Sequence, residues 1–457
     1  MSSILKQENI IMTQGSILKH IIRFALPLLI GNLLQQTYQL VDMVIVGRCI
    51  DDGGKSIAAV GLGTPLIFMM IGFFIGFSTG AGVFISNSYG AQNMPQVKKG
   101  IKISIGMAAC ISVAVSIGAI CICDWLLTVT NTNEEIFGLA STYLKIYAVG
   151  FIPMLVYNMG TSILQALGNS TSPFCYLALT CAMNIILDII FVGFLNLGVA
   201  GAAWATVISQ ATAFVLIINK IRKLDVLSQK YEENERRPLS NGRIIRSILL
   251  LSLPLALQQI TTDLSNLVLQ GTINLLGTSV VAAYGIFGKI DGFLLLPLSS
   301  FAVAMTTFTG QNYGAGRYDR ILQGKKIVMT MSVGITLVMG LLLLVAIRPA
   351  VLIFEDTPAI VDAAVEMGQI MLPFYFLLAA MRVYTGLFNG VGKPVLGSVA
   401  MIFSLCIVRI IFISVVFPLM QSADAVCYSY LFSWLVCLVI VYIEYLIFVK
   451  KEIIKKQ

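Results

Sequence analysis

Two carboxylates and their polar neighbours stand in stretches of the chain that are otherwise apolar. Asp42 follows Gln35 and Gln39 at steps that bring the three side chains onto one face of a helix. Asp188 follows Asn184 by four residues, which again places both on one helix face, one turn apart. A charge near the centre of a bilayer costs about 2.5–3.5 kcal/mol on insertion scales. Each acid therefore needs a specific partner or role.

The chemistry that such a pair of acids can perform is reversible binding of a proton or a monovalent cation. Two carboxylates that are desolvated together cannot both ionise cheaply, and a bound proton or cation relieves their repulsion. Either event changes the charge of the cavity that the acids face, which is what ion coupling requires. The alternative is a buried hydrogen-bond network that only holds helices together.

Other ionisable residues lie in apolar stretches, and for these we favour structural pairing over direct contact with a substrate. Lys145 either neutralises a carboxylate in the same half of the chain or extends its amino group toward the membrane surface. Two arginines could pair with Glu366, with Asp263 or with main-chain carbonyls. The residues of this group are Lys145, Asp263, Lys289, Asp291, Arg382 and Arg409.

The composition places these residues in a membrane protein. Hydrophobic residues make up 58% of the chain and charged residues 11%, with a mean hydropathy of +0.90, which excludes an ordinary soluble domain. Apolar runs of about 20 residues or more predict membrane-spanning helices, and their lack of a two-residue period argues against a barrel. The twelve predicted helices are 18–46, 56–88, 98–123, 136–159, 172–194, 199–221, 245–275, 279–312, 323–347, 359–388, 395–417 and 424–448.

The sequence also contains an internal repeat. Tyr89-Gly90-Ala91 recurs as Tyr313-Gly314-Ala315, 224 residues later, and the same offset carries Gly168 onto Gly392. Pro27 corresponds to Pro254 at an offset of 227. We therefore predict an all-α polytopic membrane protein with two homologous six-helix lobes. An even number of helices per lobe predicts that the two lobes are related by an axis along the membrane normal. The predicted parts are a tail at 1–15, an N-lobe at 16–221, a linker at 222–244, a C-lobe at 245–448 and a tail at 449–457.

The distribution of charge predicts the orientation of the chain. Lys and Arg concentrate at 98–102, 222–244, 317–326 and 450–456, whereas the opposite loops carry acids. This positive-inside pattern predicts that both termini are cytoplasmic. The net charge of +8 follows from this topology and from contact with membrane lipid, so it does not predict binding to nucleic acid. His20 is the single histidine and the cysteines form no ligand spacing, so we expect no metal site, no cofactor and no enzyme.

Several short stretches occur in a characteristic order along both halves. Their ordered set resembles the multidrug and toxic compound extrusion (MATE) family over nearly the whole chain. The matching stretches are Phe24-Ala25-Leu26-Pro27-Leu28, Leu40-Val41-Asp42, Ala58-Ala59-Val60-Gly61, Ser88-Tyr89-Gly90-Ala91, Leu164-Gln165-Ala166-Leu167-Gly168-Asn169, Gly198-Val199-Ala200-Gly201-Ala202-Ala203-Trp204-Ala205-Thr206, Leu253-Pro254-Leu255 and Gly310-Gln311-Asn312-Tyr313-Gly314-Ala315-Gly316.

The resemblance implies a V-shaped, twelve-helix exporter of amphipathic, often cationic, small molecules in the cell (plasma or inner) membrane, driven by inward flow of protons or sodium ions. The family's N-lobe acidic site falls on Asp42 and Asp188, with Asn184 and Thr206 as polar neighbours. Pro27 matches a proline at which the first helix bends, as a proline inside a helix permits. The expected cavity-lining residues are Gln35, Gln39, Tyr38 and Asn158.

Departures from the family pattern favour one branch over another. The positions of the acids that the NorM-type branch uses in its second lobe fall near Thr262 and Leu378, which cannot bind a cation in the same way. Asp263 is adjacent but points about 100° around the helix. The chain therefore resembles the DinF-type, N-lobe-coupled branches more closely. We expect an antiporter that acts as a monomer. The alternatives are a flippase for lipid-linked precursors, which shares the architecture, and a membrane enzyme or receptor.

Overall fold

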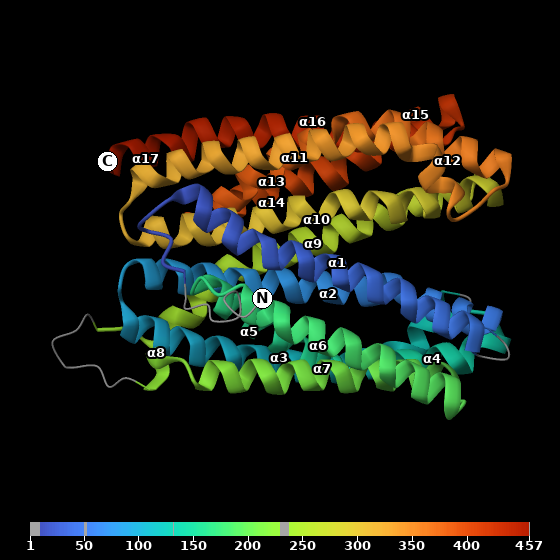
Figure 1. Ribbon diagram of the computed structural model, residues 1–457, viewed down its shortest axis with the longest axis horizontal. Coiled ribbons are helices and arrows are strands. Elements are labelled where there is room, and N and C mark those ends of the chain that lie inside the picture. The colour runs from blue at the N-terminus through green and yellow to red at the C-terminus, as the bar shows by residue number, and fades with distance from the viewer. Residues whose placement is uncertain (1–9, 50–52, 131, 229–236, 457) are drawn as a thin grey trace. The chain divides into compact units, whose positions relative to one another are not determined.

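A computed structural model describes residues 10–49, 53–130, 132–228 and 237–456, and these residues are almost entirely helical (Figure 1). The first half contains α1 (Ile17–Cys49), α2 (Gly53–Gly90), α3 (Met94–Val129), α4 (Glu134–Val149), α5 (Phe151–Ala166), α6 (Thr171–Asp188), η1 (Ile189–Phe194), α7 (Gly198–Arg222) and α8 (Asp225–Ser228). The second half contains α9 (Asn241–Asn274), α10 (Thr278–Gly314), α11 (Tyr318–Leu352), α12 (Pro358–Met371), η2 (Leu372–Phe374), α13 (Tyr375–Gly390), α14 (Pro394–Ile402), η3 (Phe403–Val408), α15 (Arg409–Met420), α16 (Ala423–Glu444), η4 (Tyr445–Lys450) and α17 (Lys451–Lys456).

The number of membrane spans agrees with the sequence. Within the described residues, eleven helices are long and apolar enough to cross a membrane, and the pair α4 and α5 makes a twelfth span if the two count as one. The axis bends by 42° between Val149 and Phe151. The predicted helix 136–159 is in fact this bent pair, and it continues to Ala166 because Ile163, Leu164 and Ala166 are buried.

The backbone repeats together with the sequence, which confirms the two homologous halves. A positive φ is uncommon for any residue other than glycine. Three positions with positive φ in the first half have a counterpart with positive φ in the second half, 224 or 225 residues later. Each of them ends or follows the corresponding helix of its half. The pairs are Gln92 (57°) with Gly316 (70°), Gly168 (87°) with Gly392 (77°), and Asn196 (51°) with Gln421 (46°).

The contacts divide the chain into two compact units whose borders fall inside helices. Unit 1 contains Ile30–Tyr89 and Asn93–Ser252, whereas unit 2 contains Ile11–Leu29 and Leu253 onward. Helix α1 therefore changes unit two residues after Pro27, and α9 changes unit one residue before Pro254. The units are groups of contacting residues and the predicted lobes are sequence repeats, so the lobe boundaries at 16–221 and 245–448 stay predictions.

Unit 1 is held together by close helix approaches at small residues. Helix α3 packs on α4 and α5, and α7 packs on α4, α5 and α6. A Cβ atom at Gly80 would overlap the main chain of Ser252, whose hydroxyl donates to the carbonyl oxygen of Phe77 at 2.7 Å. Small residues let helices approach closely where water gives no hydrophobic drive between them.

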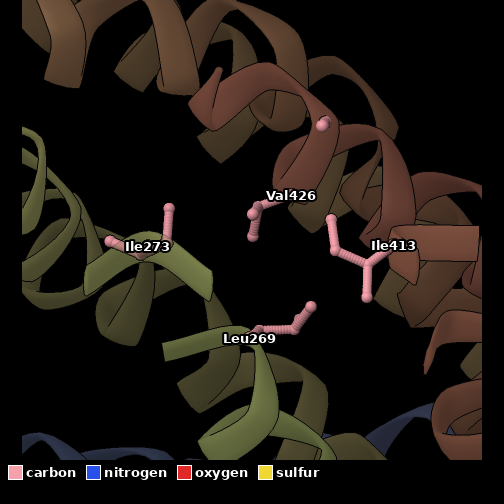
Figure 2. Packing of buried hydrophobic residues seen from close by; sticks show 5 residues of the cluster. Leu269, Ile273, Ile413 and Val426 are labelled. Atoms are coloured by element: carbon pink, nitrogen blue, oxygen red, sulfur yellow. The ribbon is translucent and has the colours of Figure 1, made fainter. Parts of the chain in front are cut away.

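Unit 2 is built around α10, which packs on α11, α12 and α13, while α16 packs on α12, α13 and α15. An apolar cluster joins α9, α15 and α16 in this unit. Figure 2 shows Leu269 and Ile273 of α9 facing Ile413 of α15 and Val426 of α16. Tyr284 of α10 and Tyr430 of α16 pack against the same cluster.

Candidate functional site

The acidic motif of α6 lies in the interior of unit 1. The exposed fraction is 3% for Asn184 and 0% for Asp188, although both belong to a candidate membrane span, Thr171–Phe194. Neither Oδ1 nor Nδ2 of Asn184 has a hydrogen-bond partner among the described residues. A buried amide without partners costs about 1–3 kcal/mol, so a polar ligand at this position would lower the free energy of the folded protein.

The helix changes its hydrogen-bond pattern directly after the acid. Residues Ile189–Phe194 form a π-helical turn, and the Leu195 N–H donates to the carbonyl oxygen of Ile190 at 2.9 Å, five residues back. Single π-helical turns within α-helices are rare and occur frequently at functional sites. Asp188 therefore stands at the junction between two helical geometries, where small changes in winding would turn its side chain.

The segment of α1 that carries Asp42 lies against this junction. Val41 packs with Ile185 of α6, Val192 of η1 and Ala202 of α7 in one apolar cluster. Ile185 and Val192 flank Asp188 by three and four residues, so the backbone next to Asp42 lies beside the turn that holds Asp188. The side chains of Asp42 and Gln39 are outside the described residues. The expected approach of the two carboxylates therefore stays a prediction.

The remaining predicted residues lie at different places. Thr206 of α7 donates its hydroxyl to the carbonyl oxygen of Ala202 at 3.1 Å, which places it beside the same cluster. Asn158 of α5 donates its amide to Met154 in its own helix at 2.9 Å. Gln35 and Tyr38 are half-buried on α1, and Pro27 is buried in the part of α1 that belongs to unit 2. Their roles as cavity lining and hinge stay predictions.

Lys145 forms an ion pair with a carboxylate of its own half, which is one of the two alternatives considered for it from the sequence. Its Nζ atom lies 2.6 Å from Oδ2 of Asp124, with side-chain exposures of 38% and 53%. The other carboxylate oxygen of Asp124 accepts from the Ser141 hydroxyl at 2.6 Å. The lysine therefore neutralises a carboxylate of its own half, at the partly exposed face between α3 and α4.

A second polar cluster lies in unit 2, and the sequence analysis named two of its members, Arg409 and Asp291, but not the partners that they bind. Arg409 is 2% exposed. Its Nε donates to Ser433 Oγ at 3.1 Å and its Nη1 to Asn266 Oδ1 at 3.2 Å. Its guanidinium lies 4.3 Å from the ring centroid of Tyr430. Arg409 is therefore bound by neutral side chains and not by the predicted carboxylates, because α9 and α16 place Asn266, Ser433 and Tyr430 next to its guanidinium.

Asp291 and its partners extend this cluster across unit 2. The Tyr375 hydroxyl donates to the carboxylate of Asp291, and the Tyr375 ring contacts Trp434 at a centroid distance of 5.0 Å. The hydroxyls of Tyr284 and Tyr430 lie 3.0 Å apart. These contacts join residues more than 50 positions apart, so no local spacing could have revealed them. A neutral tyrosine partner can hold Asp291 in either protonation state, since a phenol both donates and accepts.

A duplicated helical membrane protein with ionisable residues buried in its spans has the architecture of a secondary transporter. The model of the MatE family matches residues 27–190 and 254–415, one stretch in each half. The chain therefore belongs to the MatE family, a family of membrane transporters. It is an integral protein of the cell membrane.

Relatives of this chain carry names that indicate drug resistance. The chain is 32% identical over 308 residues to the probable multidrug resistance protein YoeA of Bacillus subtilis, covering 66% of this chain and 65% of that protein. It is 25% identical over 381 residues to the probable multidrug resistance protein NorM of Thermotoga maritima, covering 82% and 80%. The match thus spans slightly less than two thirds of the length of YoeA.

The fold also has solved counterparts. An outward-facing multidrug resistance MATE family transporter of the MOP superfamily superposes with a TM-score of 0.88 at 21% identity, covering 98% of this chain and 99% of that one. A MOP superfamily transporter from Pyrococcus furiosus, whose binding pocket is described as having reverse polarity, superposes with a TM-score of 0.86 at 20% identity. At these identities the likeness concerns the fold alone.

Proposed function

We propose that this protein is an antiporter that exports amphipathic, cationic or neutral small molecules in exchange for protons or sodium ions. The observation that carries the proposal is the complete burial of Asp188 beside Asn184 within a membrane span. Ionisable residues in such positions mark ion pathways in membrane proteins. The names of the relatives support the class of substrate.

The chemistry follows from the cost of a buried charge. When a proton or sodium ion is bound, the pair of Asp188 and the ion carries no net charge, and the site is stable in a dry interior. When the ion leaves, the free carboxylate requires water or a positively charged or neutral polar substrate. Binding of ion and binding of substrate therefore exclude one another, which is the requirement for exchange. Asp42 on α1 is the second carboxylate of this proposed site.

The topology completes the proposal. Basic segments at 222–244 and 450–456 favour a cytoplasmic location for the linker and for both termini. Ions that enter along their gradient would then move toward these segments, and substrates would leave in the opposite direction. Cysteines placed one at a time at Ser240 and at Asp356, in a chain whose nine native cysteines are replaced by serine, test this orientation when they are labelled from outside intact cells. Only the second should react.

The function is tested by transport in reconstituted vesicles with one gradient at a time. Purified protein is placed in vesicles, and the movement of ethidium, a cationic dye, is followed under a proton gradient alone, a sodium gradient alone, or neither. We expect transport of the dye with one gradient and none without. The matched control is Asp188→Asn protein at equal density in the membrane. Absence of transport by the wild-type chain under every gradient, with ethidium and with a neutral amphipathic dye, contradicts the proposal.

A further inference from the structure

The residues that precede α1 form a strap on the surface of unit 2. This strap, residues Met12–Gly15, lies against the end of α10 and the beginning of α11. The Met12 N–H donates to Gln311 Oε1 at 2.9 Å, and Asn312 Nδ2 donates to the Met12 carbonyl oxygen at 3.2 Å. Gln311 and Asn312 are 0% exposed. The end of α10 therefore offers one acceptor and one donor that match the main chain of Met12.

Arg320 of α11 binds three carbonyl groups of the strap. Its Nη1 donates to Gly15 at 3.0 Å, and its Nη2 donates to Met12 at 3.1 Å and to Gln14 at 3.3 Å. Its Nε donates to Asn312 Oδ1 at 3.2 Å. The planar guanidinium suits such a divergent set of acceptors, and hydrogen bonds from a charged donor are stronger than neutral ones. Only 8% of Arg320 is exposed.

Contacts within and around the strap fix its main-chain conformation. Gly15 has a φ of 73°, which residues with a side chain adopt rarely. A Cβ atom at this position would lie 2.9 Å from His20 Nε2, and that nitrogen is itself 2.8 Å from the Gln14 carbonyl oxygen. Asn312 Nδ2 is held additionally by the Phe308 carbonyl oxygen at 2.8 Å. Main-chain turn, histidine and asparagine thus fix the carbonyls that Arg320 binds.

The strap matters because of the helix that follows it. Helix α1 begins at Ile17, and its residues up to Leu29 belong to unit 2. From Ile30 the same helix belongs to unit 1, and this later part carries Asp42. The strap therefore fixes the first end of a helix whose other end carries a proposed ion-binding acid. A helix anchored at one end can transmit rotation or bending, whereas an unanchored one would move freely.

We propose that Arg320 is a positioning residue for transport, because it clamps Met12–Gly15 onto unit 2 and so anchors the first end of α1. The inference rests on the proposed function, since it assigns Arg320 to the same transport cycle. An arginine that only sets the orientation of the chain in the membrane needs its positive charge. Such a role does not require that the guanidinium of Arg320 be buried or that it form four hydrogen bonds. The clamp accounts for both.

The test compares Arg320→Gln with Arg317→Gln. Arg317 is a close neighbour that is 48% exposed and lies 3.5 Å from Asp319, so its variant controls for loss of a positive charge. In wild type and both variants we measure dye transport, equilibrium dye binding in detergent, and hydrogen exchange of residues 12–20. For Arg320→Gln we expect at least tenfold faster exchange in this segment, at least fivefold lower maximal transport, and a dissociation constant within twofold of wild type. Arg317→Gln should match wild type in all three.

A second variant tests the clamp from the side of the strap. Gly15→Ala leaves Arg320 in place but disturbs the turn, and it should reproduce the faster exchange and the slower transport. It also decides the matter if Arg320→Gln protein does not accumulate. Faster exchange in a variant shows that the strap has been released. If both variants exchange faster and still transport dye at the wild-type rate, the inference is wrong. If Arg320→Gln protein is not obtained, the same result with Gly15→Ala alone overturns it. Failure of the proposed function is a separate result, in which the wild-type chain itself transports no dye.

Discussion

At the scale of single residues, a buried carboxylate and a buried guanidinium have different surroundings. Asp188 is fully buried beside the Asn184 amide, whose polar atoms have no hydrogen-bond partner among the described residues. Arg409 is equally buried but is held by Asn266, Ser433 and the Tyr430 ring. A satisfied buried network fixes one structure, whereas the unpartnered amide of Asn184 can bind a polar ligand.

Asp188→Asn should abolish transport while the protein still folds. The amide keeps the size of the side chain but removes the charge that must alternate, and neutralising a buried carboxylate relieves its desolvation cost. We expect gradient-driven dye transport at the level of protein-free vesicles, with an unchanged or higher melting temperature in detergent. Asp42→Asn should behave in the same way. Asp362→Asn is the control, because that acid is 62% exposed. Coupled transport by Asp188→Asn at the wild-type rate would remove this acid from the mechanism.

Arg409→Ala should reduce the amount of folded protein more than the turnover of each folded molecule. The change removes a donor from Ser433, which is 0% exposed, and a buried polar group left unsatisfied costs roughly 1–3 kcal/mol. The control is Arg348→Ala, whose ion pair with Asp362 is exposed and should contribute less than about 1 kcal/mol. Yield, melting temperature and transport per molecule are compared. Normal yield with lost turnover would assign Arg409 to transport instead.

Residue spacing could predict neighbours along one helix but not across helices. Asn184 and Asp188 were selected because four residues make one turn, and both are buried on α6. Tyr375, by contrast, bonds Asp291 across 84 residues, and Asn266 bonds Arg409 across 143. Only the packing of α9, α10, α13 and α15 creates these pairs. Arg320 likewise showed in the sequence only as one of several basic residues.

At the scale of helices, the apolar runs predicted where spans lie but not where they bend or what they touch. The bend between α4 and α5 falls at Gly150 and could not be located, because the apolar run continues through it. The change of unit within α1 and α9 was also not predicted. Hydropathy measures the cost of leaving water and is the same whichever helix becomes the neighbour.

The close approach at Gly80 gives a prediction at this scale. Gly80→Ala would push α2 away from the main chain of Ser252 on α9, and overpacking of this kind costs about 1–3 kcal/mol. Gly118→Ala in α3 is the matched control, since a Cβ atom there meets nothing within 4 Å and alanine favours a helix by about 1 kcal/mol. We expect a lower melting temperature for the first variant and an equal or higher one for the second. Equal melting temperatures would show that α2 and α9 can separate without cost.

At the scale of the whole molecule, the duplication was readable from the sequence because glycine and proline mark backbone geometry. Gly168 and Gly392 both take a left-handed conformation after the same helix of each half. The two contact units, however, do not coincide with the two repeats. Each unit takes the beginning of one long helix from the other repeat, so neither half of the sequence contains a complete unit.

Because each unit contains the beginning of a helix from the other repeat, we can predict how the two halves behave when they are expressed as separate chains. Residues 1–228 and 237–457, expressed as separate chains, should each accumulate poorly, because the second chain lacks Ile11–Leu29 and the first lacks the beginning of α9. Co-expression should restore a membrane complex that survives purification through a tag on one fragment. Arg320→Gln in the second fragment should weaken this recovery, whereas Arg317→Gln should not. Full accumulation of either fragment alone would contradict the assignment of these segments.

The clamp between the strap and Arg320 also sets an order of events during synthesis. Met12 is synthesised before its partner Arg320, which is made 308 positions later. At about 5–20 residues per second, the beginning of α1 waits roughly 15 to 60 seconds before its binding site exists. During this time the helix is in the membrane without its final neighbours. The strap therefore reaches its native contacts only after α11 has been made, and until then it is accessible to quality-control proteases.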